Sequence, residues 1–321
     1  MNYTALIENR KSVREFRNKE VPAATVAELQ KYYETGCQRL VPELATELKI
    51  LGTEARSALE GSAGYEDFLV GAPRYLVLLT EEGEAAVENA GYMMEDLILK
   101  LTDLGLDSCW ITFADEEKVR KALNLDTDKK IAALAAFGYG ERTAKKMRFN
   151  ILSMSKVDIA AKRSYYSHKK DINEIAFVGQ VGCTQGLEEE MGFYEDMLWQ
   201  ALYAVTKTPS YLNRQPYAFL LKDQDVALLR MPDAYTDDVS AKLNLGVAML
   251  HFGAVASQWV GKVRWELNPE TSLELPEGVS LEAVWHMSHT RKSLCQRHRL
   301  FFMEEFLDSV PGNAYNGFQK K

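Results

Sequence analysis

The chain repeats a short pattern at a fixed distance of 155 residues. Asn89-x-Gly91 recurs as Asn244-x-Gly246, and Trp110 recurs as Trp265, so 244 − 89 and 265 − 110 both equal 155. An apolar run with helical spacing follows each Asn-x-Gly, and an apolar run of strand length closes each half. Because a fixed long period is the signature of duplicated units, the sequence predicts two related halves that pack together.

Composition places the chain among soluble globular proteins. Its 321 residues are 46% hydrophobic and 26% charged, enough for two medium domains with real cores. The net charge of −8 argues against bulk nucleic-acid binding. No apolar signal core and no run of about 20 apolar residues are present, so no membrane partner is expected. The four cysteines, which form no CxxC, favour free thiols and a cytoplasmic location.

The regular elements predicted from apolar periodicity alternate between helices and strands. Gly105 is expected to end the first long helix. Residues 150–175 have poor periodicity and are predicted to be a connector. A further helix is predicted to start at Pro22, and a short strand is predicted beyond Gly105. The other predicted helices span 3–8, 84–104, 115–123, 193–205 and 247–259, and the other predicted strands span 75–79, 131–137, 218–221 and 281–287.

A stretch between a predicted helix and strand is dense in turn formers and side-chain amides. Residues 207–217 read KTPSYLNRQPY, with Pro209-Ser210-x-x-Asn213-x-Gln215 at the centre. Backbone N–H groups freed in such a turn could face a polar ligand, and Asn213 and Gln215 would add donors and acceptors. An ordinary helix-to-strand turn has the same composition, so both interpretations stay open.

A basic segment near the start carries a second pattern. In an extended chain, Arg10, Ser12 and Arg14 fall on one side because side chains alternate. Two guanidinium groups and a hydroxyl on one side suit a phosphate, since arginine offers forked donors and a fixed charge. Most short basic runs are solvated surface, so this segment is weak evidence by itself.

Taken together, Arg-x-Ser-x-Arg-x-Phe and Pro-Ser-x-x-Asn-x-Gln-Pro resemble the FMN-dependent nitroreductase family. The resemblance implies an α+β fold with mostly antiparallel sheets flanked by helices, and a flavin held between two subunits that each supply one motif. Here one chain carries one copy of each, as in fused members. The chain is therefore predicted to be an intrachain pseudo-dimer with a first half at 1–155, a connector at 156–190 and a second half at 191–321.

Two further segments match the family by position. The backbone of Thr112 and Phe113, after the first long helix, would address flavin N5, although a plain strand with a packed Trp110 fits as well. Lys146 and Arg148 stand where the family places phosphate-binding cations, although a solvated charge run fits too. Residues 35–40 do not match the Pro-Ser turn, and the 155-residue offset puts Tyr165, Ser167 and Lys169 opposite the basic segment. One complete flavin site per chain is therefore expected.

The resemblance implies an FMN-dependent oxidoreductase of nitroreductase type. Hydride would pass from NAD(P)H through flavin N5 to a small aromatic or quinone-like acceptor, and no dedicated catalytic acid or base is predicted. The alternatives are an FMN-binding protein with little or no turnover and a structural pseudo-dimer without cofactor. The chain would be monomeric or a higher homo-oligomer. The predicted cofactor-binding residues are Arg10, Lys11, Ser12, Arg14, Thr112, Phe113, Lys146, Arg148, Pro209, Ser210, Tyr211, Asn213 and Gln215.

One group of residues near the end of the printed sequence has side chains that bind metals in other proteins. His286, His289, Cys295 and His298 invite a zinc interpretation. On a strand, His286 and His289 would face opposite sides, which disfavours joint ligation. We therefore predict no metal site. The sequence also contains no P-loop, nucleophile elbow, HExxH or dinucleotide fingerprint.

Overall fold

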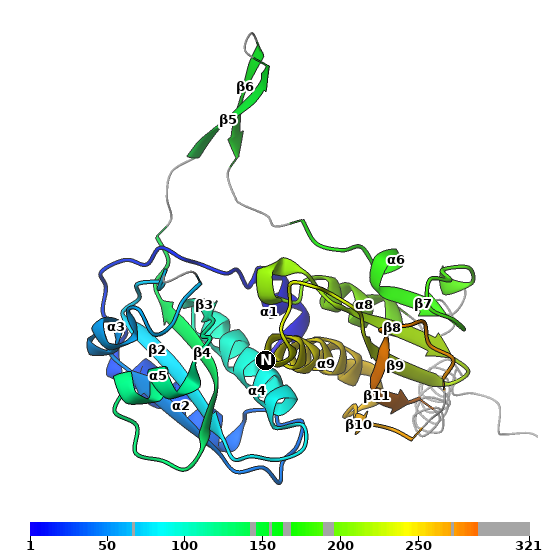
Figure 1. Cartoon of the computed structure of the whole chain (residues 1–321), viewed down its shortest axis with the longest axis horizontal. Coiled ribbons are helices and arrows are strands. Elements are labelled where there is room, and N and C mark those ends of the chain that lie inside the picture. The colour runs from blue at the N-terminus through cyan, green and yellow to red at the C-terminus, as the bar shows by residue number, and fades with distance from the viewer. Residues whose placement is uncertain are drawn as a thin grey trace, which may run out of the picture.

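A computed structural model describes residues 1–65, 68–141, 146–153, 156–162, 168–188, 196–270 and 273–287, with backbone alone in 146–153 and 156–162. The chain forms two larger sheets at opposite ends of the molecule. Two long helices, α4 (Ala86–Asp103) and α9 (Asp238–Val260), lie between them (Figure 1). This arrangement of two sheets flanked by helices agrees with the predicted α+β class.

The first sheet joins four antiparallel strands in the order β1-β2-β4-β3. The central strands β2 and β4 are apolar and buried along nearly their whole length, as expected for strands covered on both faces. β1 was not among the predicted strands, although Leu48 and Ile50 alternate with Glu47 and Lys49. The strands are β1 Thr46–Leu51, β2 Arg74–Thr80, β3 Asp107–Ile111 and β4 Lys130–Gly138.

The helices of the first half have local sequence signals at their ends. α4 ends where predicted, because Gly105 adopts the left-handed φ of +74° that closes a helix. Asp115 caps α5 (Glu116–Ala122) by accepting a hydrogen bond from Lys118 N. The other helices of this half are α1 Tyr3–Asn9, α2 Ala23–Thr35 and α3 Glu54–Leu59.

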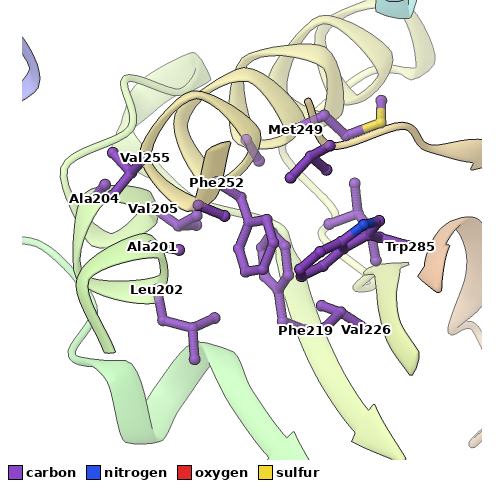
Figure 2. Packing of buried hydrophobic residues seen from close by; sticks show 14 of the residues in the cluster. Ala201, Leu202, Ala204, Val205, Phe219, Val226, Met249, Phe252, Val255 and Trp285 are labelled. Atoms are coloured by element: carbon purple, nitrogen blue, oxygen red, sulfur yellow. The ribbon is translucent and has the colours of Figure 1, made fainter. Parts of the chain in front are cut away.

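The second sheet has the order β10-β11-β9-β8-β7, and all its pairs are antiparallel except β7 with β8. Its core is aromatic: Phe252 of α9 stacks on Phe219 with ring centroids 5.2 Å apart and meets the edge of Trp285 at 5.7 Å (Figure 2). The elements are α6 Ile172–Ile175, β7 Ala176–Val178, α8 Met197–Thr206, the short 3₁₀ helix η1 Tyr211–Asn213, β8 Tyr217–Lys222, β9 Asp225–Arg230, β10 Glu266–Leu267 and β11 Ser280–His286.

The two sheets share one strand order. If the strands of the first sheet are numbered along the chain, their order in the sheet is first, second, fourth, third. Strands β8, β9, β11 and β10 of the second sheet lie in this same order. In both halves the long central helix connects the second strand to the third, as α4 between β2 and β3 and as α9 between β9 and β10. The second sheet adds β7 outside this common set, and β7 falls in the predicted connector.

The central helices cross where the repeated Asn-x-Gly pattern places glycines. A Cβ atom on Gly91 would lie 2.3 Å from the Leu243 carbonyl oxygen, and one on Gly246 would lie 2.0 Å from the Glu88 carbonyl oxygen. The two contacts are reciprocal under the same offset, since 246 − 91 and 243 − 88 both equal 155. Glycine is needed at both positions because any side chain would push the two helix backbones apart.

The segment predicted to be an irregular connector contains regular structure. β5 (Lys146–Ser153) and β6 (Lys156–Lys162) pair antiparallel and project away from the two sheets in Figure 1. Neither of these two strands was predicted from the sequence, and they overlap the segment whose apolar periodicity was judged poor. The signal was available, since Met147, Phe149 and Ile151 alternate with polar residues.

The apolar character of α9 reflects burial inside the protein. Among the described residues, α9 is the one helix long and apolar enough to cross a membrane, with a mean hydropathy of 1.3 over its best window. The structure buries 78% of that window between the second sheet and α4. The same composition is typical of a core helix, so α9 is weak evidence for membrane insertion.

Candidate functional site

The basic segment lies along the open edge of the first sheet. Helix α1 packs against α4, α8 and α9, and the chain then crosses to β3. There Ser12 bridges to Ser108, and the N–H of Val13 donates to the Ser108 carbonyl at 2.9 Å. Farther along, Phe16 bridges to Gly140. The segment is thus held by main-chain pairing with the first sheet, which is the extended arrangement that the phosphate interpretation of its sequence assumed.

Buried Asp96 of α4 anchors α1 ahead of this segment. Its carboxylate accepts hydrogen bonds at 2.8 Å from the hydroxyls of Tyr3 and Tyr32 and from the N–H of Gln38. Burial raises the pKa of Asp96, although these three donors oppose the increase. The three contacts attach α1, α2 and the loop after α2 to one turn of α4, so the start of the basic segment has a defined position.

The arginines of the segment have different environments. The Arg10 side chain is 7% exposed, and its Nε lies 3.3 Å from Oε1 of Glu95 in α4. Its NH1 donates to the Ser12 hydroxyl at 3.4 Å. Arg14 is exposed and forms no ion pair with a described carboxylate. Arg10 is therefore an internal, charge-paired residue, whereas Arg14 is available to an external anion.

Glu95 is the centre of a buried polar network that the sequence did not predict. The Trp110 indole N–H donates to Glu95 Oε2 at 2.8 Å, and His251 Nε2 lies 3.2 Å from Oε1. Burial alone would raise the pKa of this carboxyl, but Arg10, His251 and Trp110 together hold it below its ordinary value. Glu95 is therefore ionised at neutral pH and paired with Arg10.

His251 extends this network to the second predicted segment. Its Nδ1 lies 3.1 Å from the Thr208 hydroxyl and 3.2 Å from the Ala204 carbonyl oxygen. Thr208 is fully buried and directly precedes the Pro-Ser turn. A continuous chain of contacts thus joins Arg10 to the turn through two side chains, one from each central helix.

The turn has an unusual backbone. Leu212, Asn213 and Gln215 all have left-handed φ values, at 49°, 58° and 47°. The Ser210 hydroxyl accepts from the Gln215 N–H at 2.9 Å, and Asn244 Oδ1 accepts from the Tyr211 N–H at 3.1 Å. Left-handed non-glycine residues cost roughly 1–2 kcal/mol each and are concentrated at functional sites.

The two predicted segments share one cavity of about 2620 Å³ between the halves. The prediction would have failed if Arg10 and Asn213 lay on remote surfaces, but both line this cavity. The lining from the first half includes Arg10, Lys11, Ser12, Arg14, Thr112 and Phe113. The lining from the second half includes Pro209, Ser210, Tyr211 and Asn213.

The family model described as "Putative TM nitroreductase" matches residues 2–256. The chain belongs to this nitroreductase family. It is similar to a "putative nitroreductase" from Thermotoga maritima at 16% identity and a TM-score of 0.53, covering 89% of this chain and 94% of that one. A search of curated proteins returned no match.

Two clostridial structures are each similar to less than half of this nitroreductase-family chain. One is an FMN-dependent nitroreductase from Clostridium difficile, with 18% identity, a TM-score of 0.38, and coverage of 43% of this chain and 88% of that one. The other is a "putative NADH oxidase" from Clostridium acetobutylicum, with 22% identity, a TM-score of 0.38, and coverage of 43% and 89%.

Gln215 was predicted to bind the cofactor, but it is not among the residues that line the cavity. The side chain is buried: its Oε1 accepts from the Lys170 N–H at 2.9 Å, and its Nε2 donates to the Thr206 carbonyl at 3.1 Å. The left-handed backbone of Gln215 turns the amide under the loop. Gln215 therefore shapes the turn, and the prediction that it covers a ring is corrected to a supporting role.

Asn213 lines the cavity, but its side-chain amide forms a hydrogen bond within the protein. Its Nδ2 donates to the His168 carbonyl oxygen, which fastens residues 168–170 against the turn. Asn213→Ala is expected to lower the free energy of unfolding by about 1–2 kcal/mol, through loss of this bond and a left-handed alanine. Asn213→Gly, which loses the bond but keeps the conformation, should be milder. Chemical denaturation of both variants measures the difference, and equal losses would contradict a strain contribution.

Several predicted residues fall outside what the structure describes. Lys146 and Arg148 lie in β5, where the backbone alone is described, so their phosphate role stays a prediction. His289, Cys295 and His298 lie outside the described residues. His286 pairs with Glu266 and Asp225, each at 2.8 Å, and these hydrogen bonds raise its pKa. Within the described part of the chain, no three His, Cys, Asp or Glu side chains are arranged so that they could hold a metal ion.

Asn244 leaves one buried donor unused. Its side chain is 5% exposed at the cavity wall, and while Oδ1 holds the turn, Nδ2 has no hydrogen-bond partner. Its counterpart Asn89 is fully used: Oδ1 accepts from Leu40 and Val41 N–H groups, and Nδ2 contacts Met93 Sδ at 3.5 Å. Since an unpaired buried amide is costly, the wall of this cavity fits a ligand that offers an acceptor.

Proposed function

We propose that this nitroreductase-family oxidoreductase binds one FMN per chain in the cavity between its halves. The proposal is that hydride from NAD(P)H passes through the flavin to a small aromatic or quinone-like acceptor. The observation that carries it is the shared cavity, with Ser12 and Arg14 on one wall and the Pro209–Asn213 turn on the other. The cations suit a phosphate, and the turn, together with the spare donor of Asn244, suits a polar heterocycle.

In this proposal, one wall of the cavity would bind the phosphate of the cofactor and the other wall would contact its ring. Ser12 and Arg14, with Lys11, would hold the phosphate. Arg10 would position Ser12 through the hydrogen bond that it donates to the Ser12 hydroxyl. The turn from Pro209 to Asn213 and the backbone at Thr112 and Phe113 would bound the ring. The flavin supplies the redox chemistry when bound, whereas the protein orients it and excludes water.

The proposal includes an internal duplication packed as a pseudo-dimer. The halves would be 1–155 and 191–321, joined by 156–190, of which α6 and β7 pack with the second half. The common strand order and the reciprocal glycine contacts at an offset of 155 support a duplication. Because each half carries a different part of the flavin site, one flavin per chain is expected.

Visible spectroscopy of the purified chain tests the proposal. Addition of FMN to the apoprotein should give a bound flavin spectrum that saturates at one equivalent, and anaerobic NADH or NADPH should then bleach it. Reoxidation by a nitroaromatic or quinone would complete the cycle. Bound flavin without bleaching would favour a binding protein, and the absence of any flavin binding would leave a structural pseudo-dimer.

Arg14→Ala is expected to weaken FMN binding by about tenfold to a hundredfold. A charge-assisted hydrogen bond contributes about 1.5–3 kcal/mol, and Arg14 has no described carboxylate to pair with instead. Riboflavin, which lacks the phosphate, should bind wild type and variant equally. Fluorescence titration with both flavins measures this, and an equal loss for riboflavin would contradict the phosphate role.

A further inference from the structure

Residues His168 to Lys170 form one wall of the cavity. They lie in the segment that was predicted to be a connector. The Lys170 N–H donates to Gln215 Oε1 and its Nζ to the Gln215 carbonyl, each at 2.9 Å. The His168 carbonyl accepts from Asn213, and Lys169 Nζ donates to the Thr208 carbonyl at 2.8 Å. Four contacts therefore fix this segment against the Pro-Ser turn, and all three residues line the cavity.

Lys169 is a partly buried cation without a counter-charge of its own. Burial is the largest cause that lowers the pKa of Lys169 to about 8; the nearby charges of Arg10 and Lys207 act in the same direction, and Glu95 opposes them. Glu95 cannot neutralise it fully, because that carboxylate already contacts Arg10, His251 and Trp110. The hydrogen bond to Thr208 satisfies one donor of the ammonium group and leaves two.

Lys207 adds a second cation to the same wall. Its Nζ lies 4.3 Å from the centroid of the Tyr203 ring, and Lys207 and Tyr203 both line the cavity. Within the described part of the chain, neither Lys207 nor Lys169 forms an ion pair with a carboxylate. The charge of Lys207 acts unfavourably on the ammonium group of Lys169, and an anion bound near both would offset this repulsion.

We propose that Lys169 and Lys207, in addition to the residues of the Ser12–Arg14 segment, form an anion subsite that takes an oxyanion of the ligand held in this cavity. The proposal rests on the proposed function for the identity of that ligand. A phosphate or a carboxylate would satisfy the two free donors of Lys169. The oxyanion has two possible sources, the phosphate of the cofactor or an acidic substituent on the electron acceptor.

Paired ligands that differ in charge test the subsite on the full chain. Lys169→Met is expected to weaken at least one anionic probe about tenfold relative to its neutral counterpart, and Lys169→Arg should retain most of the affinity. The first pair is FMN and riboflavin, followed by flavin fluorescence. The second pair is 4-nitrobenzoate and 4-nitrobenzyl alcohol, followed by perturbation of the bound flavin spectrum. A selective loss in the first pair assigns the cofactor phosphate, and one in the second assigns the acceptor.

Two controls separate the possible failures. Lys222→Met changes an exposed lysine outside the cavity lining and should alter none of the four affinities. If wild type binds no flavin, the proposed function fails, but calorimetry of inorganic phosphate binding to wild type and Lys169→Met still decides the subsite. Equal effects of Lys169→Met on anionic and neutral probes, or no effect on any probe, would overturn the proposal.

The pH dependence gives a second signature. Since Lys169 loses its proton as pH rises through about 8 in the free protein, affinity for the anionic probe should fall above that pH. The charged groups around it are Arg10, Lys207 and Glu95, and Glu95 is already ionised at this pH. Lys169→Met should remove this step, and an unchanged step in the variant would count against Lys169 as its source.

Discussion

Glu95→Ala is expected to lower the free energy of unfolding by about 3–5 kcal/mol, because it leaves the guanidinium of Arg10 buried without a counter-charge. It also removes the acceptor for the Trp110 indole and a contact of His251. Denaturant titration followed by circular dichroism measures the loss. The variant should also bind FMN more weakly, since Arg10 holds Ser12 and His251 holds Thr208.

A double variant provides the control for this prediction. In Arg10→Met with Glu95→Leu, both buried charges are replaced by apolar groups, and such replacements are often neutral or stabilising. The double variant should therefore regain most of the stability lost in Glu95→Ala. A loss below about 1 kcal/mol in the single variant would show that Arg10 reaches water or another anion once Glu95 is gone.

A methyl group at position 246 is expected to separate the central helices and destabilise the protein by about 1–3 kcal/mol or more. The new Cβ would lie 2.0 Å from the Glu88 carbonyl oxygen, a backbone atom that can move only with the whole of α4. The same helix contains a matched control. At Gly253 the nearest neighbour of a new Cβ lies 3.6 Å away, so Gly253→Ala meets ordinary contacts.

The two alanine variants should therefore differ in stability, because only Gly246→Ala is expected to be destabilising. Gly253→Ala is expected to be neutral or stabilising by up to about 1 kcal/mol, because alanine is the better helix former. Thermal and chemical unfolding of both variants tests this difference. If Gly246→Ala unfolds at the wild-type midpoint, the close crossing of α4 and α9 does not hold the halves together.

Much of the fold was predictable because local signals agreed with the global arrangement. Continuous apolar runs marked β2, β4 and β8, and Gly105 marked the end of α4. β1 and the β5–β6 pair were missed although their alternation is visible in the sequence, since alternating apolar and polar residues give a weaker signal than continuous apolar runs. The convergence of the two separated motifs on one cavity was also expected from the resemblance to the family.

The polar network at the centre was beyond sequence reasoning. Glu95 and His251 lie within apolar helical stripes, where a single polar residue has no local partner to suggest its role. The sequence separation between them is 156 residues, and their contact depends on how α4 and α9 cross. The role of Lys169 was hidden in the same way, because its neighbours come from a turn about 40 residues later.

By itself, the amino-acid sequence determined the long apolar helices and strands, the repeated Asn-x-Gly pattern, and the two segments that carry cations and amides. Those properties depend on neighbours along the chain and on the 155-residue repeat. Only the tertiary structure decided that Arg10 is neutralised by Glu95, that Gln215 turns inward, and that Lys169 enters the cavity. Burial and charge pairing depend on distances in space, and the packing of α4 against α9 sets those distances.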